Sequence, residues 1–370
     1  MARTFDTLSK CLRAIAQTAP FGQSVTVRYA SIAVAVGAIA YAFAWSAGWV
    51  TWPAHRARLS AEHVVNAFES SAGAHPGFRR NHAKGICVTG RFESNGAGAA
   101  LSRAVVFEKG VVPVVGRFSV PGTNPTQMDS AAQLRSLALR ITASDGQQWR
   151  TAMNSVPVFS VRTPDDFVKE LGAMHVDQAT GKPDPVRLAA FDAQHPETRT
   201  LRDWLASHPP SSGFGNATYY SISAFRFIDS HGAARYVRWS MVSDTPYRPV
   251  GDAERRDPDF LAHRLVTGLD DGPMRWHLML AVAQPGDAIT DSTSVWPQTA
   301  DRVRVDAGML VIERAQTQID GPCRNIDFDP LVLPAGIEPS GDPLLAARSA
   351  TYMESFSRRM AEEVHFARGR

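Results

Sequence analysis

The chain has 370 residues, of which 44% are hydrophobic and 20% are charged, a balance that is typical of a folded protein. Lysine and arginine together number 39 and aspartate and glutamate 36, so the net charge is only +3 and gives no reason to expect a nucleic-acid-binding protein. The three cysteines exclude a disulfide-dense scaffold and a metal site with four cysteine ligands.

The first distinct segment is an uncharged, largely apolar run from Tyr29 to Ala54, with three tryptophans near its end. About 20 apolar residues in a helix cross the hydrocarbon core of a bilayer, and tryptophans gather at its interface. We therefore expect an N-terminal segment over residues 1–28, a transmembrane helix over 29–52 and a domain over 53–370. The alternatives are a cleaved signal peptide, with a small-x-small motif at residues 42–44, and a buried core helix.

The charges beside this run predict its orientation. Four basic residues precede it, whereas the basic residues after it are soon followed by glutamates. The positive-inside rule then places the N-terminus in the cytoplasm and the catalytic domain on the periplasmic side of a single-pass membrane protein. Because Cys11 precedes the run, Cys87 and Cys323 are the plausible disulfide pair; free thiols are the favoured expectation, and the pairing stays open.

The rest of the chain alternates between strand and helix patterns. Strands are expected at Ile86–Glu93, Ser102–Glu108, Val112–Val120, Leu134–Thr142, Val156–Val161, Tyr219–Ile228, Arg235–Ser243, Trp276–Val282 and Gly308–Arg314. Helices are expected at Ser60–Phe68, after Thr163, at Pro185–Ala193, Glu197–Ser207, near Asp257–Thr267, and at Pro343–Arg368. Antiparallel strands at hairpin spacing, followed by helices, indicate an α+β fold: one domain built on a β-barrel with surrounding helices.

Four short stretches remain as candidates for the chemistry, because the sequence has no Walker loop, no H-E-x-x-H, no G-x-S-x-G and no dinucleotide-binding glycine motif. They are Arg79–Gly85 (RRNHAKG), Gly116–Ser119 (GRFS), Asn154–Phe159 (NSVPVF) and Arg348–Tyr352 (RSATY). In this order and spacing they resemble the haem catalases, and more closely the catalase-related peroxidases. The resemblance implies a catalase-type antiparallel β-barrel, a C-terminal helix that carries the axial tyrosine, and haem b (iron protoporphyrin IX) as the cofactor.

The resemblance assigns catalytic roles to His82 and Asn154. His82 falls on the distal histidine, which moves a proton from the iron-bound oxygen of a peroxide to the departing oxygen. Asn154 falls on the distal asparagine, whose amide orients the peroxide. Tyr352 falls on the iron ligand, since tyrosine ligation is an established property of catalases. Arg348, one helical turn earlier, is expected to donate a hydrogen bond to the phenolate.

The resemblance also assigns five residues that hold the haem. Arg79, Arg117 and Arg359 match positions that contact the propionates, and guanidinium groups suit carboxylates. Phe167 matches an aromatic residue that packs on the distal haem face. Ser119 matches a serine that can bond to the far ring nitrogen of the distal histidine and so select its tautomer.

The sequence departs from the catalases at several points. It ends soon after Tyr352, so we expect neither their helical domain nor their full tetramer, and the oligomeric state stays open. Gln133 stands where catalases carry an acidic residue in the access channel, and Asn81 replaces the usual apolar residue before His82. These differences predict a more open and more polar pocket.

We therefore expect a membrane-anchored haem peroxidase, an oxidoreductase that reduces organic peroxides and hydrogen peroxide with small reducing donors. Weak catalase activity at most is expected, because a second hydrogen peroxide would reach an open pocket in a poor pose. The alternatives are a true catalase, a hydroperoxide isomerase on the same barrel, and a non-catalytic haem-binding protein. Without the resemblance, an anchored β-rich binding domain would remain.

Overall fold

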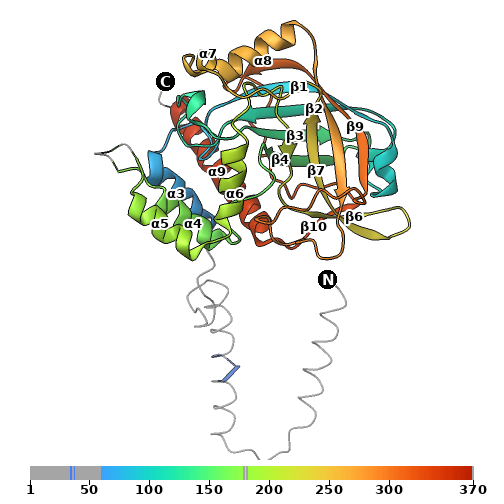
Figure 1. The fold of residues 1–370 in the computed structure, drawn as a ribbon, viewed down its shortest axis with the longest axis horizontal. Coiled ribbons are helices and arrows are strands. Elements are labelled where there is room, and N and C mark those ends of the chain that lie inside the picture. The colour runs from blue at the N-terminus through green and yellow to red at the C-terminus, as the bar shows by residue number, and fades with distance from the viewer. Residues whose placement is uncertain (1–33, 36, 38–59, 178–179, 181, 369–370) are drawn as a thin grey trace, which may run out of the picture. The chain divides into compact units, whose positions relative to one another are not determined.

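The computed structural model describes residues 34, 35, 37, 60–177, 180 and 182–368 (Figure 1). The expected N-terminal segment and almost all of the expected transmembrane helix lie outside these residues. Among the described residues, no helix combines the length and the hydrophobicity needed to cross a membrane. The described residues from 60 onward belong to one compact unit.

Antiparallel strands close into a β-barrel. In the described part of the chain, ten strands form one sheet in the order β10-β6-β7-β5-β4-β3-β2-β1-β9-β8, and β8 pairs again with β7, which closes the ring. The strands of the ring are β1 (Gly85–Ser94), β2 (Gly110–Ser119), β3 (Ser136–Thr142), β4 (Gln148–Asn154), β5 (Tyr219–Tyr220), β7 (Ala234–Ser243), β8 (Met274–Val282) and β9 (Arg304–Thr317). β6 (Phe225–Ile228) and β10 (Ile337–Pro339) extend the sheet from β7. The expected antiparallel barrel is confirmed.

Side-chain alternation along the strands separates the barrel core from an outer face. In β3, Leu137, Leu139 and Ile141 are fully buried in the core, and Trp149 and Met153 of β4 join them. The residues between them point to the opposite face of the sheet. On β2–β4 that face lies against helices rather than solvent, and the functional site forms there (Figure 1).

Helices gather beside this part of the barrel. α3 (Ala61–Ala72) begins after Ser60 and α4 (Pro164–Ala173) after Thr163, and both hydroxyls accept a backbone N–H of the first turn. The long α9 (Pro343–Arg368) contacts α3 and α4, and α4 contacts α5 (Pro185–Gln194) (Figure 1). The other helices are α6 (Thr198–Ser207), α7 (Asp252–Arg255), α8 (Phe260–Asp270) and the 3-10 turns η1 (Ala97–Ala100), η2 (Val105–Phe107) and η3 (Asp129–Ala131).

Several expected strands are wrong. Ser102–Glu108 contains the 3-10 turn η2. Val156–Val161 is a series of turns, and Pro157 has no backbone N–H to donate to a ladder. Tyr219–Ile228 divides into β5 and β6, because Ile222 has a φ of 63° that interrupts the extended backbone.

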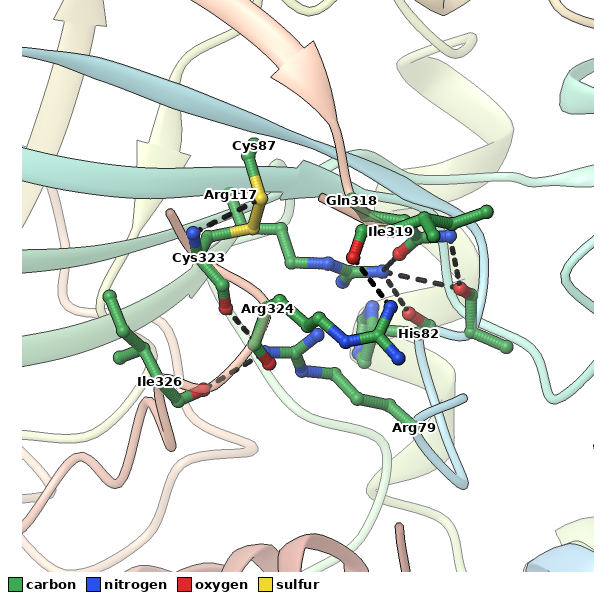
Figure 2. The surroundings of a disulfide bond; sticks show 10 residues. Arg79, His82, Cys87, Arg117, Gln318, Ile319, Cys323, Arg324 and Ile326 are labelled. Carbon is green, nitrogen blue, oxygen red and sulfur yellow. Dashed lines mark hydrogen bonds between the residues drawn. A yellow bond between two sulfur atoms is a disulfide. The ribbon is translucent and has the colours of Figure 1, made fainter. Parts of the chain in front are cut away.

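Cys87 and Cys323 form a disulfide, which corrects the expectation of free thiols. Their Cα atoms lie 5.3 Å apart, although 236 residues separate them in the sequence. Both side chains are fully buried in a small cluster with Ile326 and Phe328. The strand register directs the Cys87 side chain toward the segment that precedes α9. The spacing of the cysteines in the sequence does not predict this contact. The bond therefore ties that segment to β1 (Figure 2).

Candidate active site

One cavity between the barrel and the helices brings together all nine predicted site residues. They are Arg79, His82, Arg117, Ser119, Asn154, Phe167, Arg348, Tyr352 and Arg359. The walls come from β2, β3, β4, α3, α4 and α9. The empty volume is about 1350 Å³, part of it open to solvent.

The strand register explains why residues from three strands meet in this cavity. Two cross-strand rows result: Ser119, Ser136 and Asn154 in one, and Arg117, Ala138 and Ala152 in the other. All of them lie between the inward-facing core residues of their strands, so they face the helices. The side chains of the two alanines are short, so they leave space above the sheet for a flat ligand.

His82 lies in a constrained loop before β1. Its φ of 56° is in the left-handed region, which is uncommon for a residue other than glycine and concentrates at functional sites. The Asn81 side-chain oxygen accepts hydrogen bonds from His82 N at 2.8 Å and Gly122 N at 3.0 Å. Arg117 donates to the His82 carbonyl oxygen at 2.8 Å. These bonds hold the histidine in place.

The His82 side chain is half-buried and neutral. Burial, followed by the guanidiniums of Arg117, Arg348 and Arg79, lowers the pKa of His82 to about 3. Ser119 Oγ lies 3.4 Å from His82 Nδ1, as expected from the sequence. Since Nδ1 is engaged there, Nε2 is the nitrogen that remains for a ligand.

Ser136 orients the Asn154 amide. Ser136 Oγ donates to Asn154 Oδ1 at 2.6 Å, so the amide nitrogen, which can only donate, is left for the cavity. Sequence reasoning missed the role of Ser136. Only the pairing of β3 with β4 places Ser136 opposite Asn154, and β4 was not predicted from the sequence.

Three arginines, two of them buried, lie along the cavity without a carboxylate partner. In the part of the chain that the structure describes, no ion pair joins Arg79, Arg117 or Arg359 to an acid; Arg79 donates to the carbonyl oxygens of Cys323 at 3.1 Å and Ile326 at 2.9 Å. Arg117 and Arg359 are only 3% and 2% exposed, and the Nε of each has no hydrogen-bond partner. Figure 2 shows Arg79 and Arg117 with His82 beside the disulfide.

The arginines disfavour one another's charge. Burial, followed by repulsion from Arg359, lowers the pKa of Arg117 to about 9, and burial with both neighbours lowers the pKa of Arg79. Gly85 makes room for this cluster, because a Cβ there would lie 2.6 Å from Arg117 Cζ. Such a cluster suits an anionic ligand with more than one negative charge.

Tyr352 and Arg348 both reach the cavity from α9. Tyr352 packs against the cluster that contains the disulfide, Ile326 and Phe328. Arg348 Nη2 donates to the Ala152 carbonyl oxygen at 3.1 Å. The hydrogen bonds of the described residues include none from Arg348 to the Tyr352 oxygen, so that expected contact stays a prediction.

Aromatic residues complete the cavity on the α4 side. The Phe167 ring lies 5.7 Å from that of Phe68 in α3 and 5.3 Å from that of Phe159. Phe159 lines the cavity with the other two rings. Phe68 was not predicted as a site residue, because its helical spacing looked like that of an ordinary buried face.

The family of the chain follows from comparison with known proteins. The family model described as Catalase matches residues 75–366. The chain belongs to the catalase family. A catalase-related peroxidase of Synechococcus elongatus is 36% identical over 303 residues, which cover 81% of this chain and 89% of that protein. A catalase-related peroxidase of Mycolicibacterium paratuberculosis is 33% identical over 301 residues, or 80% and 94% of the two chains.

Full-length catalases are more distant relatives. Mouse catalase is 27% identical over 300 residues, which cover 75% of this chain but 55% of the mouse protein. The solved structure of catalase A from Saccharomyces cerevisiae superposes with a TM-score of 0.70 at 19% identity, covering 77% of this chain and 62% of the yeast chain. The barrel fold is therefore shared with the catalases.

The residues of the cavity fit the haem that this family implies. A tyrosine is available as an iron ligand. The three arginines without a carboxylate partner, two of them with an unpartnered buried nitrogen, suit two propionates. Small alanines on the sheet and an aromatic ring on α4 offer surfaces against which a flat macrocycle can pack.

Proposed function

We propose that the protein is a haem-dependent peroxidase that reduces organic peroxides and hydrogen peroxide with small reducing donors. The observation that carries this proposal is the presence, in one cavity, of a neutral His82, an Asn154 amide oriented by Ser136, and a tyrosine near three arginines without an acid partner. The names of the two catalase-related peroxidases support it.

The cofactor is haem b, held by residues of this cavity. When bound, haem supplies the redox chemistry by taking up the oxidising equivalents of a peroxide and passing them to a donor. Tyr352 would bind the haem iron, and Arg79, Arg117 and Arg359 would bind the propionates. Arg348, one helical turn before Tyr352 on α9, would donate a hydrogen bond to the tyrosine oxygen.

His82 and Asn154 handle the peroxide. In the tautomer that carries its proton on Nδ1, which faces Ser119 Oγ, the His82 Nε2 accepts the proton of the peroxide O–H. Nε2 then delivers this proton to the departing oxygen, which leaves as an alcohol or as water. The Asn154 N–H donates to a peroxide oxygen and stabilises the charge that develops.

Steady-state assays test this function. With an organic hydroperoxide, the enzyme should oxidise two molecules of a one-electron donor per peroxide and release no oxygen. With hydrogen peroxide alone, oxygen release should be slow. Rapid oxygen release without a donor would instead identify a true catalase, and loss of a lipid hydroperoxide without donor oxidation would identify an isomerase.

The membrane anchor and the periplasmic location of the domain are part of the proposal. The uncharged run from Tyr29 to Ala54 and the basic residues before it support an anchor. The Cys87–Cys323 disulfide supports an oxidising compartment. Alkaline carbonate extraction of membranes, with protease added outside intact spheroplasts, tests both points. Release of the protein by carbonate, or protection of the domain from protease, would contradict them.

A further inference from the structure

A second pocket lies next to the arginine cluster. It is formed by residues 76–79, by Gln318, Ile319 and Arg324 near the disulfide, and by Arg359 and Glu363 of α9, and its empty volume is about 1020 Å³. We call it the edge pocket. None of the residues that line it is His82, Asn154 or Tyr352, so the proposed peroxide chemistry does not use it.

Two arginines belong to both cavities. Arg79 and Arg359 line the candidate haem cavity and also the edge pocket. Arg359 is 2% exposed, and its Nε has no hydrogen-bond partner. A molecule in the edge pocket would therefore lie behind the guanidiniums that face the cofactor.

The chemistry of the edge pocket suits an anion with an apolar body. Arg79, Arg117 and Arg359 exceed the two proposed propionates by one positive charge, and Arg324 adds another that it shares with the Glu363 carboxylate 3.0 Å away. Apolar surface comes from Phe78 and from Ile319, which is 53% exposed. A planar aromatic molecule with an acidic substituent matches both features.

The segment that carries these groups is held in place. Arg324 Nη1 donates to the Ile319 carbonyl oxygen at 2.5 Å, and Gln318 bridges the Ala83 carbonyl oxygen at 3.0 Å and the Arg117 guanidinium at 2.5 Å. Cys323, beside Arg324, is tied to β1 by the disulfide (Figure 2). The edge pocket is thus a prearranged site and not a chance surface hollow.

We propose that the edge pocket binds the reducing donor, and that this donor is an anionic aromatic compound with an oxidisable hydroxyl group. The assignment rests on the proposed peroxidase function. In the net reaction ROOH + 2 AH2 → ROH + H2O + 2 AH•, each donor loses one electron and one proton, and the peroxide takes up both pairs as its O–O bond breaks. A donor passes on an electron without entering the peroxide cavity. A site that only Arg79 and Arg359 separate from the cofactor is therefore close enough for this transfer.

Charge reversal at Arg324 tests the donor site. Arg324→Glu should lower kcat/KM for the anionic phenol guaiacolsulfonate by about tenfold and leave kcat/KM for the neutral phenol guaiacol nearly unchanged. The matched control is Arg226→Glu on β6, because Arg226 also pairs with a glutamate and is similarly exposed (39% against 32%). Raising the ionic strength should reproduce the loss in wild type and have little effect in Arg324→Glu.

A binding measurement separates the donor site from turnover. Calorimetric titration of the resting holoenzyme with benzenesulfonate should show binding in wild type and Arg226→Glu and none in Arg324→Glu. Equal effects of Arg324→Glu on both donors, or unchanged benzenesulfonate binding, would overturn the donor site and leave the peroxidase function intact. If wild type oxidises neither donor, the peroxidase proposal fails and the donor assignment fails with it.

Discussion

At the residue scale, His82 has a left-handed backbone conformation and a neutral imidazole. One substitution removes the imidazole and keeps the backbone conformation. Asparagine tolerates positive φ values, so His82→Asn should keep the loop and the bound haem. Because it removes the proton acceptor, the rate of reaction with peroxide should fall by about 10²–10⁴-fold. Stopped-flow mixing with peroxide measures this rate, and haem content is read from the same sample. A rate within a few-fold of wild type would contradict the role of His82.

Arg359 tests whether the arginine cluster is built for an anionic ligand. Replacing a buried cation that lacks a partner should stabilise the haem-free protein, so Arg359→Leu should raise its melting temperature. The same change should weaken haem binding by about 2–5 kcal/mol, since it removes one side of a charge-assisted pair. Thermal unfolding with and without haem measures both effects.

The neighbouring Arg358 provides the control for this experiment. It pairs with Glu69 at 2.9 Å and with Glu354 at 2.7 Å, so its role is structural. Arg358→Leu should cost about 1 kcal/mol of stability or less and leave haem affinity unchanged. If Arg359→Leu behaves like Arg358→Leu, the cluster does not hold the propionates.

The site residues named by the family resemblance all line the cavity, whereas their supporting residues were missed. Asn81 was noticed only as a departure, yet its side chain holds the loop of His82. Ser136 and Gln318 act on residues that are distant in sequence. Such roles depend on strand register and loop packing, which are set by tertiary structure and not by a local motif.

At the element scale, α4 carries a carboxyl group that makes stability depend on pH. Burial, helped by the charge of Asp192, raises the pKa of Glu170 to about 7, against the opposing effects of a hydrogen bond from Ser160 at 2.6 Å and the charge of His195. The folded state therefore binds the proton more tightly than the unfolded state, whose carboxyl has a pKa of about 4.3. The contribution is fully present below pH 4 and is lost as the pH rises toward 7.

Glu170→Gln should remove this dependence. The variant should match wild type near pH 4 and exceed it by about 3 kcal/mol at pH 8, because glutamine stays neutral. Urea unfolding at several pH values measures the difference between the two proteins. A difference that does not change with pH would show that Glu170 is not held protonated.

The disulfide ties β1, which follows the loop of His82, to the segment before α9 that lines the cavity. Cys87 belongs to β1, and the segment after Cys323 supplies carbonyl acceptors to Arg79 and packing to Tyr352. The double variant Cys87→Ala with Cys323→Ala should lose about 2–4 kcal/mol of stability and release haem faster. Melting temperature and haem transfer to an acceptor protein measure these effects. The variant should be insensitive to a reductant that destabilises wild type, and equal sensitivity would rule out this role.

Elements with local signals were predicted, and those without were missed. The caps of α3 and α4 were read from Ser60 and Thr163. β4 was missed because Thr151, in the middle of its buried face between Trp149 and Met153, is polar. The break between β5 and β6 comes from the positive φ of Ile222, and an isoleucine in the sequence does not predict that conformation.

At the scale of the whole molecule, the barrel and the helices create two cavities that share a wall of arginines. The peroxide-handling residues line one cavity, and the edge pocket opens on the other side of Arg79 and Arg359. The two substrates of a peroxidase could therefore approach from different sides. The antiparallel barrel was predicted from strand spacing, but the placement of these cavities outside it depends on how α3, α4 and α9 pack.

The most direct test is the visible absorption spectrum of the purified protein, prepared with haem available, for wild type and Tyr352→Phe. Wild type should give a high-spin ferric spectrum with a charge-transfer band of phenolate ligation, and Tyr352→Phe should lose that band or the haem itself. An unchanged spectrum in Tyr352→Phe, or no haem in wild type under conditions that load a control haem protein, would contradict the assignment of this cavity as a tyrosine-ligated haem site.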